Sequence, residues 1–152
     1  MTGGSRQMAQ AAERGARSQD IEARLVTARD ANADDVLWGD GYIFVTPENL
    51  ASMAGAMKDF FDRTYYAAIE RVNGRPYATL VCAGSDGHNA VRQIDRICTG
   101  WRLKRVSEPL IVCTHAQTPE RILAQKTIET DDLRKCEEIG AALGAGLALG
   151  IF

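Results

Sequence analysis

Short apolar runs that alternate with helical patterns limit the folds open to this chain. The runs Tyr42–Thr46 and Tyr77–Ala83 are rich in β-branched and aromatic residues and are bounded by turn residues. Such runs predict strands buried on both faces. Because apolar residues recur at helical spacing between these runs, we predict an α/β fold with a mostly parallel sheet covered by helices on both faces.

The first half of the chain supplies three further elements. Periodicity predicts a helix over Ser5–Arg17, whose small apolar stripe suits packing on a sheet. The alternation in Glu22–Thr27 predicts a half-exposed edge strand, and residues 31–40 predict a turn with one short helix. Pro47 is expected to end the strand that begins at Tyr42, with a loop over residues 48–53.

The second half continues the alternation. Helical patterns follow each buried strand, and Gly100 stands where a helix-terminating glycine is expected. Residues 102–115 predict a strand, a kink at Pro109 and a second strand. Thr118 and Thr130 are predicted to cap a short helix and the last helix.

Bulk composition restricts the classes of partner. The 152 residues suit one domain, 1–152, with 45% hydrophobic and 25% charged residues. The net charge of −2 without a basic cluster argues against nucleic acid or an anionic membrane as partner. No apolar stretch reaches the roughly 20 residues of a membrane span, and the start does not resemble a signal peptide, so a cytoplasmic location is expected.

The four cysteines show no metal or redox spacing. Cys82, Cys98, Cys113 and Cys136 form no C-x-x-C pair, and each lies in an apolar run or a helical pattern. We therefore expect reduced thiols that act as small core residues, and no metal site.

The first of three candidate loops is "TGGSR" at the start of the chain. Ligands of open parallel sheets bind beyond the carboxyl ends of the strands. Thr2 and Ser5 offer hydroxyl groups, Gly3 and Gly4 allow close approach of the backbone, and the helix start adds free N–H groups. This combination suits a phosphate; the alternative is a flexible tail with Ser5 as a plain helix cap.

The other two loops follow the two buried strands. Glu48–Ser52 form a polar loop after Pro47 whose amides could line one edge of a planar ring, or they form an ordinary connection. Gly84, Ser85 and Asp86 could approach the other side of a ligand, or could form a capping turn. His88 and His115 lie just past strand ends, where a catalytic histidine or a surface histidine would both be found. Trp38 and Trp101 are expected to be packing residues.

The order and spacing of these loops resemble the flavodoxin-like superfamily, and within it the NAD(P)H-dependent FMN reductases and quinone oxidoreductases. The stretch "TPENLASMAGAMKDFFDRT" carries the most specific part of a resemblance that covers nearly the whole chain. It implies a three-layer sandwich with a parallel sheet, bound FMN and NAD(P)H as the reductant.

The resemblance also implies which residues bind FMN. The family's phosphate loop has the form Ser/Thr-x-Thr-Gly-x-Ser/Thr, and Met1 to Ser5 match all of it except the first hydroxyl residue. The implied cofactor-binding residues are Thr2, Gly3, Gly4, Ser5 and Arg6 for the phosphate, and Pro47, Glu48, Asn49, Leu50, Gly84, Ser85 and Asp86 for the isoalloxazine ring.

One departure from the family pattern concerns the centre of the sheet. The family's first strand occupies the centre of a sheet ordered 2-1-3-4-5, and this chain has no strand before its first helix. We therefore expect a slot of about 10 Å, two strand spacings, between Glu22–Thr27 and Tyr42–Thr46. Our leading explanation is that Met1 is an internal methionine of a longer natural chain.

The function implied is an FMN-binding oxidoreductase that passes reducing equivalents from NAD(P)H through flavin to a quinone or similar small-molecule electron acceptor. Two alternatives stay open: a flavodoxin-type electron carrier without its own substrate, and an apo form that no longer binds FMN. Relatives often form dimers or tetramers, so a homodimer or homotetramer is expected. The apolar face through Met57, Phe60 and Phe61 is a candidate contact, although core packing explains it equally well.

Overall fold

The strand β3 (Pro76–Ala83) is the centre of the sheet: all of its residues are buried, and three other strands pair with it. The computed structural model describes residues 2–152. β1 (Tyr42–Asn49) pairs with β3 in parallel, in a register that runs from Tyr42 opposite Tyr77 to Pro47 opposite Cys82. β4 (Lys104–Arg105) and β5 (Leu110–Cys113) also pair with β3 in parallel, and residues 106–109 separate them. The predicted α/β class with a mostly parallel sheet is confirmed.

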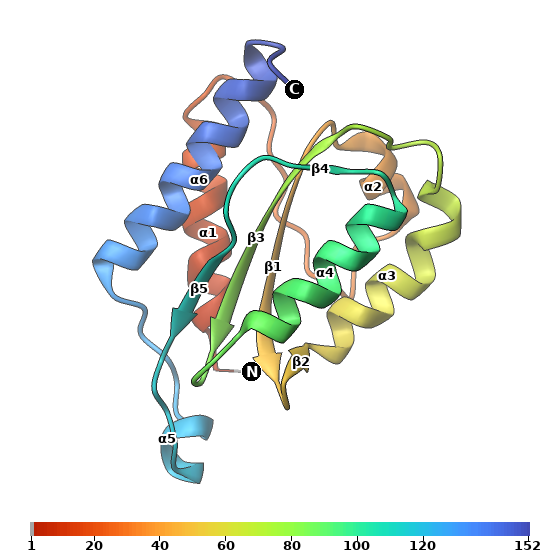
Figure 1. Cartoon of the computed structure of the whole chain (residues 1–152). Helices are drawn as coiled ribbons and strands as arrows, with labels where there is room; N and C mark the ends of the chain where they lie inside the picture. Colours follow the sequence, from red (N-terminus) through yellow and green to blue (C-terminus); the bar gives the residue numbers. More distant parts are fainter. Residues whose placement is uncertain (1) are drawn as a thin grey trace.

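Helices cover both faces of this sheet (Figure 1). α1 (Gly4–Arg17) and α6 (Thr130–Ala148) lie on one face. The other face carries α2 (Ala33–Trp38), α3 (Gly55–Ala68) and α4 (His88–Gly100). The short helix α5 (Pro119–Leu123) projects beyond the carboxyl ends of the strands.

Each face of the sheet has its own apolar core. Phe44 of β1 packs with Phe61 and Trp101 in the larger core, under α2, α3 and α4. Leu80 of β3 packs with Met8 in the smaller core, under α1 and α6. Met57, Phe60 and Phe61 are buried in the larger core, so core packing accounts for the apolar face that was a candidate subunit contact.

Close packing of α1 on α6 depends on glycine. A Cβ atom at Gly140 would overlap the carbonyl oxygen of Ala12, and one at Gly15 would overlap the carbonyl oxygen of Glu137. The two helix backbones are therefore in direct contact. The small stripe of α1 serves this contact with α6 as well as the packing on the sheet that the sequence predicted.

The chain does not leave the sheet at Pro47, which corrects the prediction that this proline ends the strand. β1 continues to Asn49 and turns into β2 (Ser52–Met53), with Glu48 opposite Met53. The expected loop over residues 48–53 is thus a β-hairpin. Proline is tolerated because the strand needs no donor at that point on its outer edge.

Two predicted helix boundaries are also wrong. Gly100 is the last residue of α4 rather than a residue beyond it, and a Cβ there would overlap the Tyr65 hydroxyl, so close packing explains the glycine. Thr130 is the first residue of α6, and the cap is Glu129 without a side-chain bond. Thr118 does cap α5, because its hydroxyl accepts from the Arg121 N–H at 3.4 Å.

The predicted strand over Glu22–Thr27 is not a strand in the structure. This segment is irregular, and among residues 2–152 no backbone hydrogen bond joins it to β1. Cavities of about 570 and 370 Å³ lie between it and Ile43 and Val45 of β1. The segment fails to form a strand because it has no neighbouring strand to pair with, and the cavities lie where the slot was expected.

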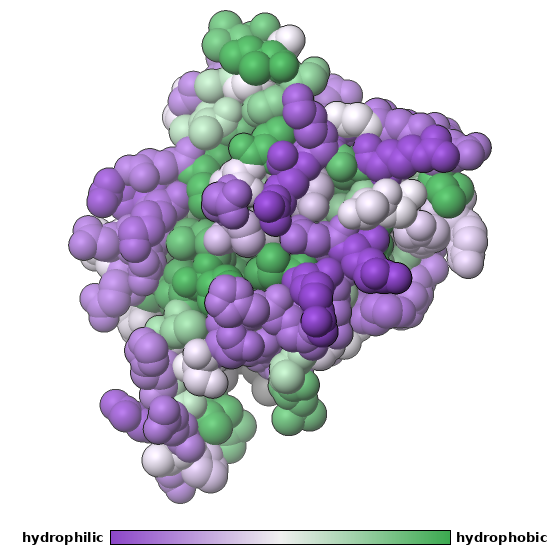
Figure 2. Space-filling model, viewed as in Figure 1, coloured by the Kyte–Doolittle hydropathy of each residue, from purple (hydrophilic) through white to green (hydrophobic). Residues whose placement is uncertain are grey.

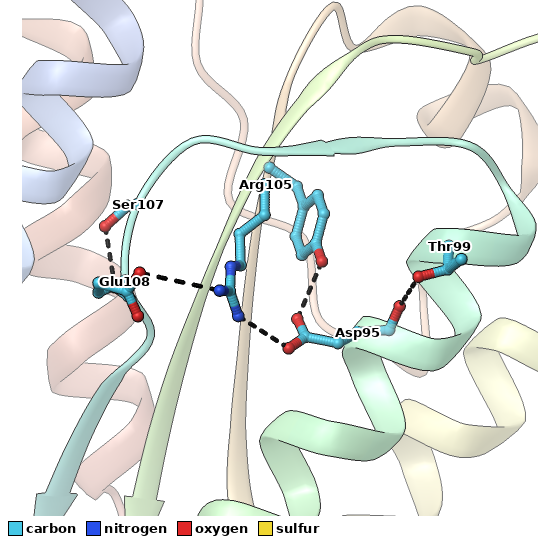
Figure 3. A network of polar contacts seen from close by, with 6 residues as sticks. Asp95, Thr99, Arg105, Ser107 and Glu108 are labelled. Atoms are coloured by element: carbon cyan, nitrogen blue, oxygen red, sulfur yellow. Dashed lines mark hydrogen bonds and ion pairs between the residues drawn. The ribbon is translucent and has the colours of Figure 1, made fainter.

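A polar network lies at the amino end of β3, where β3 pairs with β4 (Figure 3). The Tyr77 hydroxyl donates to one carboxylate oxygen of Asp95 at 2.9 Å, and Arg105 contacts the other at 3.1 Å. Arg105 also lies 3.8 Å from Glu108. Burial, followed by the bond to Asp95, raises the pKa of Tyr77. The network ties β4 to β3 and α4, where the β-ladder is only two residue pairs long.

The four cysteines are free, and Cys82, Cys98 and Cys136 are buried, as the sequence predicted. Burial raises the pKa of Cys136 to about 11, which keeps that thiol protonated at neutral pH. Trp101 is fully buried, whereas Trp38 is 41% exposed and lies beneath the Arg24 guanidinium. Among the helices within residues 2–152, none combines the length and apolar character needed to cross a membrane.

The α1–α6 contact predicts a large effect of one methyl group. We expect Gly140→Ala to lower the free energy of unfolding by about 2 kcal/mol, because overpacking outweighs the gain in helix propensity. Urea denaturation measures this. Gly55→Ala is the matched control, since a Cβ at Gly55 meets nothing within 4 Å. Equal midpoints for the two variants would contradict the close contact.

Candidate functional site

Three segments meet at the carboxyl end of the parallel strands (Figure 1). The first loop is residues 2–6, the second is the β1–β2 hairpin, and the third is residues 84–87. A Cβ at Gly4 would lie 2.6 Å from the Cys82 sulfur, so the start of α1 presses against the end of β3. Pro47 pairs with Cys82, which places the hairpin beside the same strand end.

The first loop leads into an uncapped helix. Gly3 is the N-cap of α1 with a φ of +84° and no side-chain cap, and the first turn contains no acidic residue. The Ser5 hydroxyl is buried without a hydrogen-bond partner in the described part of the chain. The loop therefore presents free N–H groups, a positive helix end and an unused hydroxyl, which together suit an anion. Met1, which takes the x position of the family's loop, lies outside the described residues.

This loop is held by the segment before α6 rather than by a strand. The Lys126 N–H donates to the Thr2 carbonyl at 2.7 Å. The Gln7 amide donates to the Lys126 carbonyl at 2.7 Å and accepts from the Ile128 N–H at 3.2 Å. Arg6, the last residue of this loop, is exposed and lines one of the two cavities beside β1.

Glu48 connects the second loop to the third. One oxygen of its carboxylate, Oε2, accepts from the Gly87 N–H at 2.8 Å. The other oxygen, Oε1, is buried and has no partner within residues 2–152. A carboxylate oxygen left without a donor is costly, so this atom is suited to accept a hydrogen bond from a ligand.

The tip of the hairpin is strained. Leu50 and Ala51 have φ values of +51° and +56°, although two-residue hairpins with positive φ at both central positions strongly favour Asn-Gly. The Leu50 side chain is fully exposed, and Asn49 is also exposed. Such outliers persist where the surrounding structure holds them, and they cluster at ligand-binding sites.

Helix α4 supplies the support for this hairpin. The Gln93 side-chain oxygen accepts from the Met53 N–H at 2.9 Å and from the Ser52 hydroxyl at 3.0 Å. The Asn89 amide donates to the Ala51 carbonyl. Sequence analysis missed Gln93, Asn89 and Gln7, because a polar side chain on a helix gives no local signal of the distant backbone that it binds.

The third loop leaves room for a ligand above Gly84. A Cβ at Gly84 would meet only the Ala116 carbonyl, at 3.7 Å, and Ser85 and Asp86 are exposed. Gly87 is different: its φ is +92°, and a Cβ there would lie 2.6 Å from the Ile111 side chain. Burial, then the charges of Asp86 and Glu48, raise the pKa of Cys113 at the end of β5, which argues against a reactive thiolate.

The two candidate histidines lie at the edge of these loops. His88 Nε2 is 4.0 Å from Asp86 Oδ1, and both side chains are exposed. His115 is exposed after β5 with a φ of +50°. Within the described residues, neither histidine has a buried hydrogen-bond or ion-pair partner.

Comparison with known proteins assigns the chain to a family. The family model for NADPH-dependent FMN reductases matches residues 31–118, which span β1, β3, β5 and the second and third loops. This chain belongs to that family. Its fold is flavodoxin-like, as the similar solved structures show.

Several flavodoxins and flavodoxin-like proteins are similar to this FMN reductase family member. A flavodoxin from Aquifex aeolicus is 40% identical over 62 residues, a segment that covers 40% of this chain and 34% of that relative. A flavodoxin from the domain Archaea superposes with a TM-score of 0.78 at 17% identity, covering 98% of this chain and 93% of the other. A WrbA-like protein from Agrobacterium tumefaciens gives a TM-score of 0.72 at 16% identity, covering 99% and 92%.

The strained hairpin of this FMN reductase family member predicts an unusual response to glycine. We expect Ala51→Gly to raise the free energy of unfolding by about 1 kcal/mol, because it removes the cost of a left-handed alanine. Ala67→Gly, the same change on the exposed face of α3, is expected to lower it by about 1 kcal/mol. Thermal unfolding compares the two. A similar loss in both variants would show that the hairpin tip is not strained.

Proposed function

We propose that this chain binds FMN across the three loops and passes reducing equivalents from NAD(P)H through the flavin to a quinone or a similar small-molecule acceptor. The observation that carries the proposal is the buried Ser5 hydroxyl without a partner, beside the uncapped start of α1. It stands at the end of the sheet where both strand-end loops converge. The family match supplies the cofactor class.

The first loop would hold the phosphate of FMN. The N–H groups of the first turn of α1 and the Ser5 hydroxyl would donate to its oxygens, and the exposed Arg6 would add charge. Gly3 and Gly4 keep side chains away from these donors. Thr2 would contribute a second hydroxyl.

The second and third loops would border the isoalloxazine ring. The free oxygen of Glu48 would accept from a ring N–H, and the backbone around Gly84, Ser85 and Asp86 would lie along another edge. Pro47, Asn49 and Leu50 would contact the ring from the hairpin. Bound FMN supplies the hydride acceptor and the electron carrier; the chain binds it, orients it and sets its electrostatic surroundings.

Protons could be exchanged at the exposed edge of this site. His88 stands beside the Asp86 carboxylate, and His115 lies on the neighbouring connection. Both are proposed as candidates for proton transfer to the acceptor.

A flavodoxin-type electron carrier is the second candidate. The 40% identity to a flavodoxin over 62 residues favours it. Oxidation of NAD(P)H by the FMN-loaded protein separates the two functions. A chain that no longer binds FMN is the third outcome.

Association into a homodimer or homotetramer is part of the proposal. Leu50 on the hairpin and Ile122 and Leu123 on α5 are exposed apolar side chains, and Figure 2 shows apolar projections at this end of the molecule. A second subunit that covers them would also shield the site from water.

Fluorescence quenching on titration with FMN tests the binding. We expect saturable binding, and we expect Ser5→Ala to weaken FMN about tenfold, since it removes a buried donor to the phosphate. Riboflavin, which lacks the phosphate, is the matched ligand and is expected to bind wild type and variant equally. Equal loss for both ligands would mean that Ser5 does not contact the phosphate, and no quenching at all would refute FMN binding.

A further inference from the structure

Lys126 lies between the first loop and helix α5, and it contacts both. Its main chain is fixed to the start of α1: the Lys126 carbonyl accepts from the Gln7 amide at 2.7 Å, and a Cβ at Gly4 would lie 3.5 Å from the Lys126 Cβ. Its N–H donates to the Thr2 carbonyl at 2.7 Å. The base of this lysine therefore stands beside the loop that we propose binds a phosphate.

The side chain of Lys126 leads from this loop to α5. Its ammonium donates to the carbonyl oxygens of Ile122 at 3.0 Å and Ala124 at 2.8 Å. It also donates to the carbonyl oxygen of Arg121. A lysine ammonium has three N–H donors. All three are therefore in use, and all three acceptors are neutral.

This ammonium holds the C-terminal end of α5. The helix has five residues, none of them buried, and it projects beyond the carboxyl ends of the strands (Figure 1). The last carbonyls of a helix have no partner within it, and Lys126 supplies a partner for three carbonyls at this end. A helix this short is unstable in isolation. Loss of the ammonium would therefore loosen α5.

The charge of Lys126 also acts at the end of β3. Burial raises the pKa of Cys82, and the positive charge of Lys126 opposes that shift. Cys82 lies directly against the first loop, since a Cβ at Gly4 would be 2.6 Å from its sulfur. The ammonium is thus close enough to the loop for its charge to be felt there.

We propose that Lys126 is a further binding residue for the phosphate group in the first loop, and that its ammonium leaves at least one carbonyl of α5 to reach that group. The proposal deepens the proposed function and rests on the first loop as the phosphate site. The buried Ser5 hydroxyl, which has no hydrogen-bond partner among residues 2–152, independently marks this loop as a place for a ligand.

The exchange follows from the number of donors and from charge. Because all three N–H groups of the ammonium bind carbonyls, a bond to phosphate must replace one of these bonds. A phosphate monoester carries a charge of about −2 near neutral pH, so it attracts an ammonium more strongly than a neutral carbonyl does. The flexible stem of lysine lets the ammonium turn while the main chain stays fixed. Phosphate binding should therefore loosen the end of α5.

Three ligands test the phosphate contact on the full chain: FMN, riboflavin, which lacks the phosphate, and inorganic phosphate. Flavin fluorescence quenching measures the affinity for the first two. Lys126→Met removes the charge, and we expect it to weaken FMN about tenfold and to leave riboflavin unchanged. Lys126→Arg keeps the charge and should retain most of the affinity for FMN. Lys104→Met removes the same charge beside the opposite end of β3, so it is the matched control and should change neither ligand.

Hydrogen exchange in the wild type tests the release of α5. The Ile122 N–H donates to the Thr118 carbonyl at 2.8 Å, within this helix. The Ala124 N–H donates to the Glu120 carbonyl at 2.9 Å. We expect exchange at both amides to become at least about threefold faster with FMN or inorganic phosphate, and to be unchanged with riboflavin. Lys126→Met should show the faster exchange without any ligand. The wild-type comparison decides even if this variant does not fold.

Two kinds of result would overturn the role of Lys126 while FMN binding itself stands. One is an FMN affinity of Lys126→Met that is unchanged, or reduced no more than its riboflavin affinity. The other is exchange in α5 that is unchanged or slower at saturating FMN. If wild type binds inorganic phosphate with faster exchange in α5 but does not bind FMN, the proposed function fails and the role of Lys126 stands. If wild type binds neither, both fail.

Discussion

The parallel ladder between β1 and β3 is the interaction on which the rest of this structure depends. It pairs residues 42–47 with residues 77–82 in the middle of the domain, and β3 is buried along its whole length. The register brings Pro47 beside Cys82, so the loops that follow both strands must meet. The bond from Gly87 to Glu48 then joins those loops across the ladder. The meeting of the second and third loops of the candidate site is a consequence of this single register.

The other edge of β1 has no strand paired with residues 42–46 within residues 2–152. Residues 21–26 run past it without pairing, and cavities lie between them. The first loop is consequently held from another direction, through Thr2 and Gln7 to the segment at Lys126 and Ile128. The first loop, which we propose binds the phosphate, and the open slot are thus neighbours, since the start of α1 borders both.

The site combines rigid support with local strain. Gln93 and Asn89 of α4 hold a hairpin whose tip contains two non-glycine residues with positive φ. Two buried oxygen atoms in the same region, Ser5 Oγ and Glu48 Oε1, have no hydrogen-bond partner among residues 2–152. Unsatisfied polar atoms and strained backbone both lower the stability of the protein without a ligand. A ligand that pairs with these atoms removes that cost when it binds. Membership of the NADPH-dependent FMN reductase family gives that ligand a chemical class.

The sequence by itself determined the α/β class, the two central strands, the three loops and the family, because apolar periodicity, turn residues and local motifs are properties of neighbouring residues. The capping role of Thr118 and the division of residues 102–115 into two strands were predicted for the same reason. Only the tertiary structure decided that Glu22–Thr27 is unpaired, that β1 passes through Pro47 into a hairpin, and that Gly100 is needed for packing against Tyr65. It alone placed Gln7, Gln93 and the Glu48–Gly87 bond. Strand pairing, close helix contacts and long-range hydrogen bonds depend on partners distant in the chain, and no local pattern specifies those partners.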